Sequence, residues 1–113
     1  MHETAIAQDI IVIVNQSLKA QPEARLGVVR VSIGKMIAVV PELLRHAYNS
    51  IVFETPLQDS TLEIDIISIT AQCQQCHQKF GLDEYEFLCP HCQSPDIHIK
   101  TGNEFYIKEL EVE

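Results

Sequence analysis

Residues 73–92 read CQQCHQKFGLDEYEFLCPHC, with a Cys-x-x-Cys pair at each end, Cys73 with Cys76 and Cys89 with Cys92. Each pair suits one tight turn that offers two thiolates, so two such turns can supply four ligands to a single tetrahedral ion. The proline that follows Cys89 stiffens the second turn between its ligands. The spacing therefore predicts a zinc ribbon, a small module that a metal ion holds together.

Zinc is the predicted ion, and two alternatives stay open. Mononuclear iron of the rubredoxin type would use the same thiolates, and two disulfides would replace the metal, although a cytosolic chain disfavours them. Four thiolates leave no open position for water, so we expect a structural site and not a catalytic one. We expect a short strand over residues 85–88 and, on metal removal, unfolding of the module. Its few apolar residues are Phe80, Leu82, Phe87 and Leu88.

Outside this stretch, apolar residues recur with the period of helices or strands. Ile6, Ile10 and Ile13 follow helical spacing, although the β-branched run of residues 10–14 would also suit a buried strand. Pro41 suits the first turn of a second helix, because the amide that proline lacks would have no partner there. The pattern predicts helices over residues 4–19 and 41–53, and strands over residues 26–33, 61–70 and 103–112.

These elements predict an α+β fold. Alternation in the second strand places Leu62, Ile64 and Ile66 on its inner face. We expect the last strand to return to the sheet of the first, so that the zinc ribbon is an insertion between two adjacent strands. The prediction is a small three-stranded sheet with two helices over residues 1–70 and 103–113, and a Cys₄ zinc-ribbon module over residues 71–102, inserted before the last strand.

Composition excludes several classes of protein. The formal net charge is −8, from 16 acidic and 8 basic residues, and no basic cluster offers a surface for nucleic-acid phosphates. No apolar run is long enough to predict a membrane-spanning helix. The chain start lacks the basic and apolar pattern of a signal peptide, which predicts a cytoplasmic protein. Neither a Ser-His-Asp pattern nor a phosphate loop indicates an enzyme.

Four histidines lie away from the start of the chain. His77 and His91 stand beside the cysteines, and we expect them to be exposed turn residues. The alternative is that they exchange into the metal sphere or hydrogen-bond to the thiolates. We expect His46 at the surface or boundary of the second helix. His98 alternates with isoleucines, which predicts a solvated strand position, with a part in binding a second metal as the alternative.

The chain starts Met1-His2-Glu3. An N-terminal amine, an ionised backbone amide and an imidazole at position 2 can form adjacent chelate rings. Nitrogen ligands in one plane suit Ni(II) or Cu(II), whose tetragonal preference differs from that of zinc. On chemistry alone, an ordinary chain start remains the more common interpretation of these residues.

The motifs together are more specific than the cysteines alone. One short chain combines four features. They are a Met-His-Glu start, Ile33-Gly34 at the end of the first strand, two Cys-x-x-Cys pairs of which the second continues Gln93-Ser94, and Thr101-Gly102-Asn103-Glu104 before the last strand. This combination resembles the HypA/HybF family, the nickel metallochaperones of nickel–iron hydrogenase maturation. The resemblance covers essentially the whole chain.

The resemblance implies a nickel-binding α/β domain with a zinc domain inserted before its last strand. It implies that His2 is the essential nickel ligand, assisted by the Met1 amine and nearby backbone nitrogens, with Glu3 as a ligand or a supporting group. In some members a carboxylate from the loop after the first strand also binds. Residues 35–40 of this chain contain no carboxylate. Either the site lacks that ligand, or another group such as Glu42 takes its place.

The resemblance also implies partners. The expected partner is a HypB-like maturation GTPase that works with the chain to load nickel into the hydrogenase large subunit, and some members also serve urease. The alternative from another functional class is a zinc-ribbon adaptor that bridges proteins and never carries nickel. This alternative accounts equally well for the cysteines and the acidic charge, so nickel titration is the measurement that separates the two.

Overall fold

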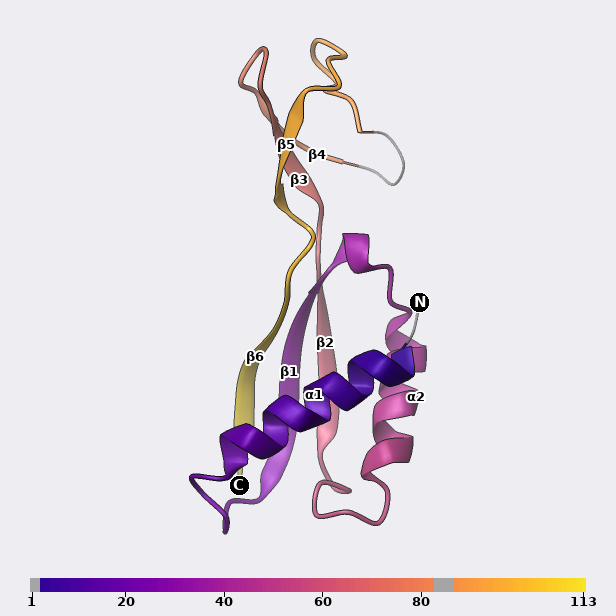
Figure 1. The fold of residues 1–113 in the computed structure, drawn as a ribbon, viewed down its shortest axis with the longest axis vertical. Coiled ribbons are helices and arrows are strands. Elements are labelled where there is room, and N and C mark those ends of the chain that lie inside the picture. Colours follow the sequence, from indigo (N-terminus) through magenta and orange to yellow (C-terminus); the bar gives the residue numbers. More distant parts are fainter. Residues whose placement is uncertain (1–2, 83–86) are drawn as a thin grey trace.

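A computed structural model describes residues 3–82 and 87–113 of the chain. The molecule is elongated, with principal extents of 55 × 25 × 17 Å, and it divides into two lobes (Figure 1). The α/β lobe consists of α1 (Glu3–Leu18), β1 (Leu26–Gly34), the 3₁₀ helix η1 (Lys35–Ile37), α2 (Pro41–Val52), β2 (Thr61–Ile67) and β6 (Phe105–Val112). The ribbon lobe consists of β3 (Thr70–Cys73), β4 (Lys79–Gly81), β5 (Ile97–Thr101) and the loops that carry the cysteines.

The sheet of the α/β lobe has the strand order β2-β1-β6. The central strand β1 is parallel to β2, with Val31 opposite Ile64, and antiparallel to β6, with Val31 opposite Ile107. The last strand therefore returns to the first sheet, as predicted. The prediction that the ribbon is inserted between two adjacent strands is wrong, because β1 lies between β2 and β6. Since the crossover through α2 places β2 on one edge of β1, only the other edge is left for β6.

The strand predicted over residues 61–70 is two strands in two different sheets. β2 ends at Ile67 and pairs with β1, whereas β3 begins at Thr70 and pairs with β4 and β5. The two residues between them carry the chain from one lobe to the other. The phase of the apolar alternation shifts by one residue at Ile66-Ile67, but the whole stretch still has the pattern of extended chain, so the pattern did not assign its two parts to different sheets.

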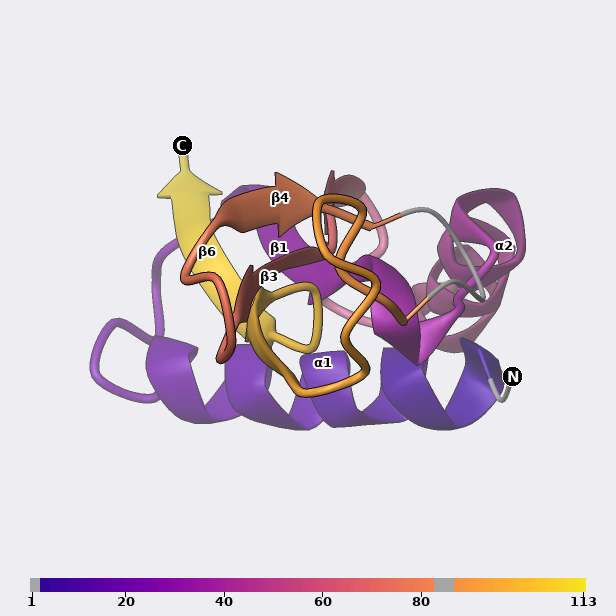
Figure 2. The same ribbon diagram turned by 90° about the horizontal axis from the view of Figure 1, so that it is seen from above.

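The main core lies between the sheet and the two helices. α1 crosses one face of the sheet, and α2 lies beside β2 and contacts α1 (Figures 1 and 2). In α1 the buried residues are Ile6, Ala7, Ile10 and Val14, whereas Ile13, which follows the predicted helical spacing, is 41% exposed. Residues three or four positions apart share the face that meets the sheet, and Ile13 falls at the edge of that face. Leu62, Leu44 and the inner residues of β1 complete this core.

The expected inward position of Ile66 is also wrong. Its side chain is exposed, although Ile33, its partner across the sheet, is fully buried. Ile66 lies near the end of β2, where the lobes meet, and it lines a shallow apolar hollow together with Met36 and Phe87. Side chains of β2 still point alternately to the two faces of the sheet at this position, but the helices do not cover this end of the strand.

Tyr48 places a phenol inside this core. Its hydroxyl is hydrogen-bonded to Ser60 Oγ at 2.6 Å, and Ser60 donates to the carbonyl of Leu57, also at 2.6 Å. Burial raises the pKa of the Tyr48 phenol above its ordinary value, and the hydrogen bond with Ser60 opposes that rise. The loop between α2 and β2 is thus fixed to the helix by a buried polar pair.

We expect Tyr48→Phe to lower the free energy of unfolding by about 1 kcal/mol at pH 7, because one buried hydrogen bond is lost. The folded state holds the phenol neutral. Its contribution is therefore fully present below the unfolded pKa of about 10 and falls as the pH rises above that value. Urea unfolding at pH 7 and at pH 11 should show that the deficit of the variant shrinks in alkali.

Tyr106→Phe is the matched control, since the Tyr106 side chain is 49% exposed on β6. That variant should unfold at the wild-type urea concentration at both pH values. A Tyr48→Phe deficit that stays constant between the two pH values would contradict the account based on burial of a neutral phenol.

The ribbon lobe has a sheet of order β4-β3-β5, antiparallel throughout. Its core is small: Ile69, Ala71 and Leu82 are buried, and Phe80, Ile97 and Ile99 pack against them. Phe87 and Leu88, expected among the module's apolar residues, are largely exposed instead. Of the strand predicted over residues 85–88, positions 85 and 86 lie outside the described residues, and positions 87 and 88 are not in a strand.

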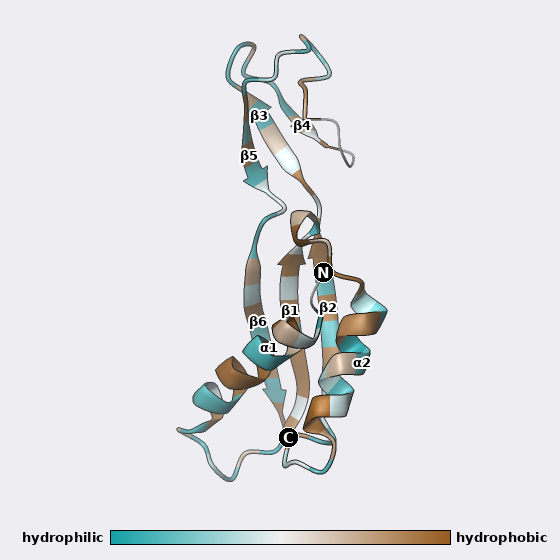
Figure 3. Cartoon of the chain, turned by 45° about the vertical axis from the view of Figure 1, so that its right-hand side comes forward, coloured by the Kyte–Doolittle hydropathy of each residue, from teal (hydrophilic) through white to brown (hydrophobic). Residues whose placement is uncertain are grey.

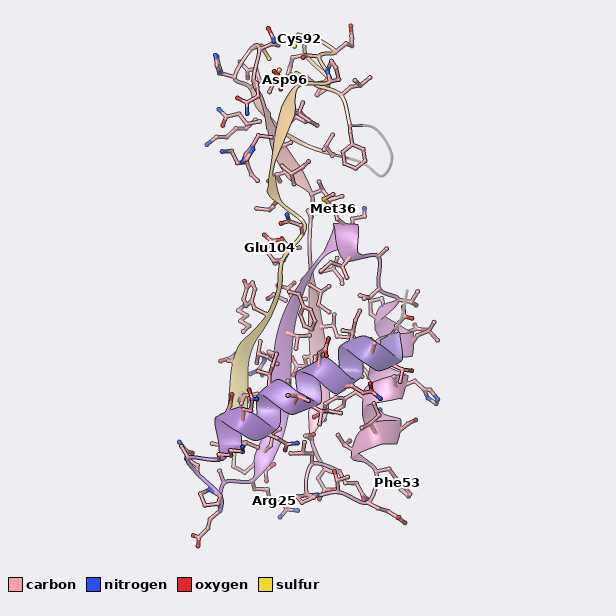
Figure 4. The ribbon with its side chains drawn as sticks, viewed as in Figure 1. Arg25, Met36, Phe53, Cys92, Asp96 and Glu104 are labelled. Carbon is pink, nitrogen blue, oxygen red and sulfur yellow. The ribbon has the colours of Figure 1, made fainter. Side chains whose placement is uncertain are left out.

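Two close backbone approaches join the lobes. Gly34 donates its amide to the carbonyl of Glu104 at 2.7 Å, and Met36 donates to the carbonyl of Gly102 at 2.8 Å. In Figure 4, Met36 and Glu104 lie on either side of the narrow junction between the lobes. The end of β1 is therefore bonded to the segment that returns from the ribbon lobe to β6.

Candidate metal sites

The four cysteines converge at the far end of the ribbon lobe (Figure 4). Their sulfur atoms all lie within 4.8 Å of one another, and none is in a disulfide. The Sγ atoms of Cys73 and Cys92 are 3.5 Å apart, and those of Cys76 and Cys89 are 3.6 Å apart. Four sulfurs placed about 2.3 Å from a central zinc would be about 3.8 Å from one another. The arrangement suits one structural metal ion.

The first cysteine turn is built by backbone hydrogen bonds around Cys73. Its carbonyl accepts the amide of His77 at 3.0 Å, and His77 has a left-handed backbone with φ of 63°. Cys73 Sγ accepts the amides of Gln75 and Cys76 at 3.3 and 3.4 Å. The amide of Cys76, followed by that of Gln75, helps to lower the pKa of the Cys73 thiol to about 7. This turn therefore favours the thiolate that a metal requires.

The second turn repeats this construction. The carbonyl of Cys89 accepts the amide of Gln93 at 2.7 Å, and Gln93 also has a left-handed backbone, with φ of 59°. Cys89 Sγ accepts the amide of His91 at 3.4 Å. Both turns thus present their first sulfur to backbone N–H groups. Figure 3 shows these loops to be largely hydrophilic, so apolar packing contributes little to their conformation.

The histidines of the ribbon lobe lie outside the sulfur cluster. His77 and His91 are exposed, as expected for turn residues, and His98 is exposed on β5. Within residues 3–82 and 87–113, the four cysteines form the one cluster of three or more metal-ligating side chains.

The other predicted site lies at the start of the chain. Met1 and His2 are outside the described residues, and Glu3 begins α1. Glu3 Oε2 accepts the amide of Val40 at 3.0 Å, which fastens the start of α1 to the residue before α2. Glu42, the suggested replacement for the missing loop carboxylate, lies in the first turn of α2 and is exposed.

Two features near Glu3 could not be predicted from the sequence. The first is the Val40 amide, which a side-chain motif cannot reveal because it belongs to the backbone. The second is His46, which lines the same hollow as Glu3 between α1 and α2. The signal for His46 was its place in the predicted second helix, but only the crossing of the two helices brings it to Glu3.

The structure combines a small α/β lobe with an appended ribbon whose four cysteines suit one structural metal ion. The model of the family "Hydrogenase/urease nickel incorporation, metallochaperone, hypA" matches residues 1–112. The chain belongs to this HypA family. Its members are metallochaperones and maturation factors, not catalysts, and this role involves them with the maturation machinery of hydrogenase.

Relatives cover nearly the full chain. A hydrogenase maturation factor HypA from Nostoc punctiforme is 35% identical over 113 residues, which is 100% of this chain and 96% of the relative. One from Picosynechococcus is 32% identical over 112 residues, covering 99% of each chain. The solution structure of the nickel metallochaperone HypA from Helicobacter pylori is 25% identical, with a TM-score of 0.67, and covers 99% of this chain and 97% of that one.

No helix within the described ranges, 3–82 and 87–113, has the length and apolar character needed to cross a membrane.

Proposed function

We propose that this chain binds Ni(II) at its start and delivers it for the maturation of nickel–iron hydrogenase. The observation that carries the proposal is the family match over residues 1–112, which includes the Met1-His2-Glu3 start. His2 is the principal ligand, assisted by the Met1 amine and adjacent backbone nitrogens. Glu3 supports the site, and its carboxylate also accepts the amide of Val40, which fixes the position of Glu3 itself.

The ion at Cys73, Cys76, Cys89 and Cys92 is Zn(II) in this proposal. Four thiolates within 4.8 Å of one another suit its tetrahedral preference and occupy every position around it. The site therefore holds the ribbon lobe together. The partners are a HypB-like maturation GTPase and the hydrogenase large subunit, and the protein acts in the cytoplasm.

Substitution His2→Ala tests the nickel site. We expect wild type to bind one Ni(II) with roughly micromolar affinity, about −8 kcal/mol, and the variant to lose this binding. Calorimetric titration of zinc-loaded protein that begins at Met1, without a tag, measures it. Zinc content and the circular dichroism spectrum should stay unchanged in the variant.

His77→Ala is the matched control, because His77 is exposed and lies in the ribbon lobe. A second control carries extra residues before Met1, which removes the amine from its place beside His2 and should weaken nickel binding. Undiminished nickel affinity in His2→Ala would contradict the assignment of the ligand. Absence of nickel binding in wild type would favour the zinc-ribbon adaptor instead.

A further inference from the structure

Strand β6 forms a free edge of the sheet in the α/β lobe. The strand order is β2-β1-β6, so β1 pairs with one side of β6 and no described strand pairs with the other. Figure 1 shows this edge on the side of the lobe away from α2. The backbone N–H and C=O groups of an edge strand can pair with another extended chain. The side chains of β6 indicate which chain fits this edge.

β6 contains a bulge at its centre. Two consecutive residues of β1 lie opposite Glu109 and Ile107, so Lys108 between them is an extra residue on β6. Ile107 and Leu110 both pack against the core. Lys108 and Glu109, which lie between them in the sequence, are both exposed and belong to the outer face of the sheet.

The bulge makes the order of faces along β6 symmetric. Counted from either end of the strand, the order is inward, outward, inward, outward. The inward residues are Phe105, Ile107, Leu110 and Val112, the last of which lies opposite the core residue Leu26, and the outward residues are Tyr106, Lys108, Glu109 and Glu111. A regular strand of eight residues would lack this symmetry, because its first and last residues would point to opposite faces.

This symmetry suits antiparallel pairing of β6 with β6 of a second copy. In such a pair, residues directly opposite each other lie on the same face of the sheet. The eight positions then pair as Phe105 with Val112, Tyr106 with Glu111, Ile107 with Leu110 and Lys108 with Glu109. Apolar side chains meet apolar ones on the inner face, and opposite charges meet on the outer face. A register shifted by one or two residues in either direction would place an inward residue opposite an outward one.

Charge also favours a second copy over other strands. A lysine on an edge strand discourages pairing, because most partner strands would leave it without a counter-ion. In the register above, Lys108 lies opposite Glu109 of the second copy, and two-fold symmetry repeats the pair. The other edge strand, β2, offers no such match. Self-pairing about its central residue, Ile64, would set Glu63 opposite Asp65 of the second copy, and the two carboxylates would repel each other.

We propose that this chain forms a symmetric homodimer through β6, which joins two sheets into one with the order β2-β1-β6-β6-β1-β2. The inward residues of β6 are only partly buried within one chain, and Val112 is 44% exposed, so the second copy covers apolar surface. An edge of eight residues is a small interface, and the dimer therefore forms at about micromolar concentrations or above. This inference is independent of the proposed function.

The test reverses one charge at a time. Lys108→Glu would set two carboxylates opposite each other, and Glu109→Lys would do the same with two ammonium groups, twice in each dimer. We expect sedimentation velocity of zinc-loaded protein to show dimers of wild type and association about tenfold weaker or more for each variant. An equimolar mixture of the two variants restores opposite charges at both positions, so it should associate about as tightly as wild type.

Lys100→Glu is the matched control, because it makes the same change of charge at an exposed lysine of β5 and should associate like wild type. Circular dichroism checks the fold of each variant. Glu109 contacts Arg30 at 3.0 Å within its own chain, so Lys108→Glu decides alone if Glu109→Lys does not fold.

Three results would each overturn the homodimer. The first is wild type that stays monomeric at roughly millimolar concentration. The second is Lys108→Glu that associates as tightly as wild type, which would place the contact on another surface. The third is a mixture of the two folded variants that stays monomeric, which would contradict the pairing of Lys108 with Glu109.

Discussion

Removal of the metal from the four cysteines is expected to unfold the ribbon lobe while the α/β lobe stays folded. Among the residues that the structure describes, the apolar cluster of the ribbon lobe has three buried members, Ile69, Ala71 and Leu82, whereas that of the α/β lobe has thirteen. At about 25 cal/mol per Å² of apolar area, three small to medium side chains cannot offset the entropy of ordering the cysteine loops. A structural zinc site contributes about 10 kcal/mol or more at neutral pH, and this contribution disappears with the ion.

Hydrogen exchange measured by mass spectrometry, before and after a strong chelator, tests this expectation. Amides of β3, β4 and β5 should lose protection, and those of β1 and β6 should keep it. Cys76→Ser should resemble the chelated protein, since one missing thiolate opens the site. His77→Ala, in the same turn but outside the sulfur cluster, should resemble wild type.

The same experiment tests the predicted domain division. Loss of protection confined to residues 71–102 would support the boundaries drawn from the sequence. If the amides of β3 and β5 stay protected without metal, the expectation is refuted. The small apolar core of the ribbon lobe and its junction with the α/β lobe would then suffice to keep the ribbon folded.

The cysteine cluster was the most predictable part of the molecule. Coordination chemistry acts over a few residues, and each Cys-x-x-Cys pair is complete within one turn. The sulfur distances of 3.5 and 3.6 Å follow from two such turns meeting. The helices were predictable for a similar reason, because their buried stripes recur within one element.

Partners that lie far apart in the sequence were not predictable. Alternation showed that residues 61–70 were extended but not that β2 and β3 pair in different sheets. It likewise placed Ile66 inward, although the helices do not cover the end of β2 where it lies. Which residues a strand faces depends on its register and on the neighbouring elements, and the local period of apolar residues determines neither.

The ion pairs of Arg30 could not be predicted from the sequence either. In the sequence it was one of several scattered basic residues. In the sheet its guanidinium contacts Glu63 at 3.3 Å, Glu109 at 3.0 Å and Glu111 at 2.9 Å. The hydrogen bond with Glu111 and the charges of the three carboxylates raise the pKa of Arg30. Only the pairing of β1 with both neighbours brings these groups together.

Substitution Gly34→Ala is expected to destabilise the protein by about 3 kcal/mol or more, because it adds a methyl group where two backbones touch. A Cβ at Gly34 would overlap the carbonyl group of Gly102 and the amide of Asn103. Both neighbours are backbone, so no side chain can rotate away. Gly102 cannot easily retreat, since its own φ is 114° and a Cβ there would lie 2.8 Å from Ile69.

Urea unfolding of zinc-loaded protein measures the effect, with Gly81→Ala as the control. The atom nearest to a Cβ at Gly81 is the Ile69 carbonyl oxygen at 3.9 Å, an ordinary contact, so that variant should lose less than about 1 kcal/mol. Equal stability of the two variants would refute the account of the junction.

We expect the contact between the lobes to affect nickel affinity as well as stability. Gly34 leads directly into η1, and the following loop ends at Val40, whose amide holds Glu3. Moving Gly34 away from Gly102 would strain or break the bonds from Gly34 to Glu104 and from Met36 to Gly102. We therefore expect Gly34→Ala to weaken nickel binding at the chain start as well as the fold, whereas Gly81→Ala should leave nickel binding unchanged. A loss of stability without a loss of nickel affinity would show that Val40 keeps its position independently of the contact between the lobes.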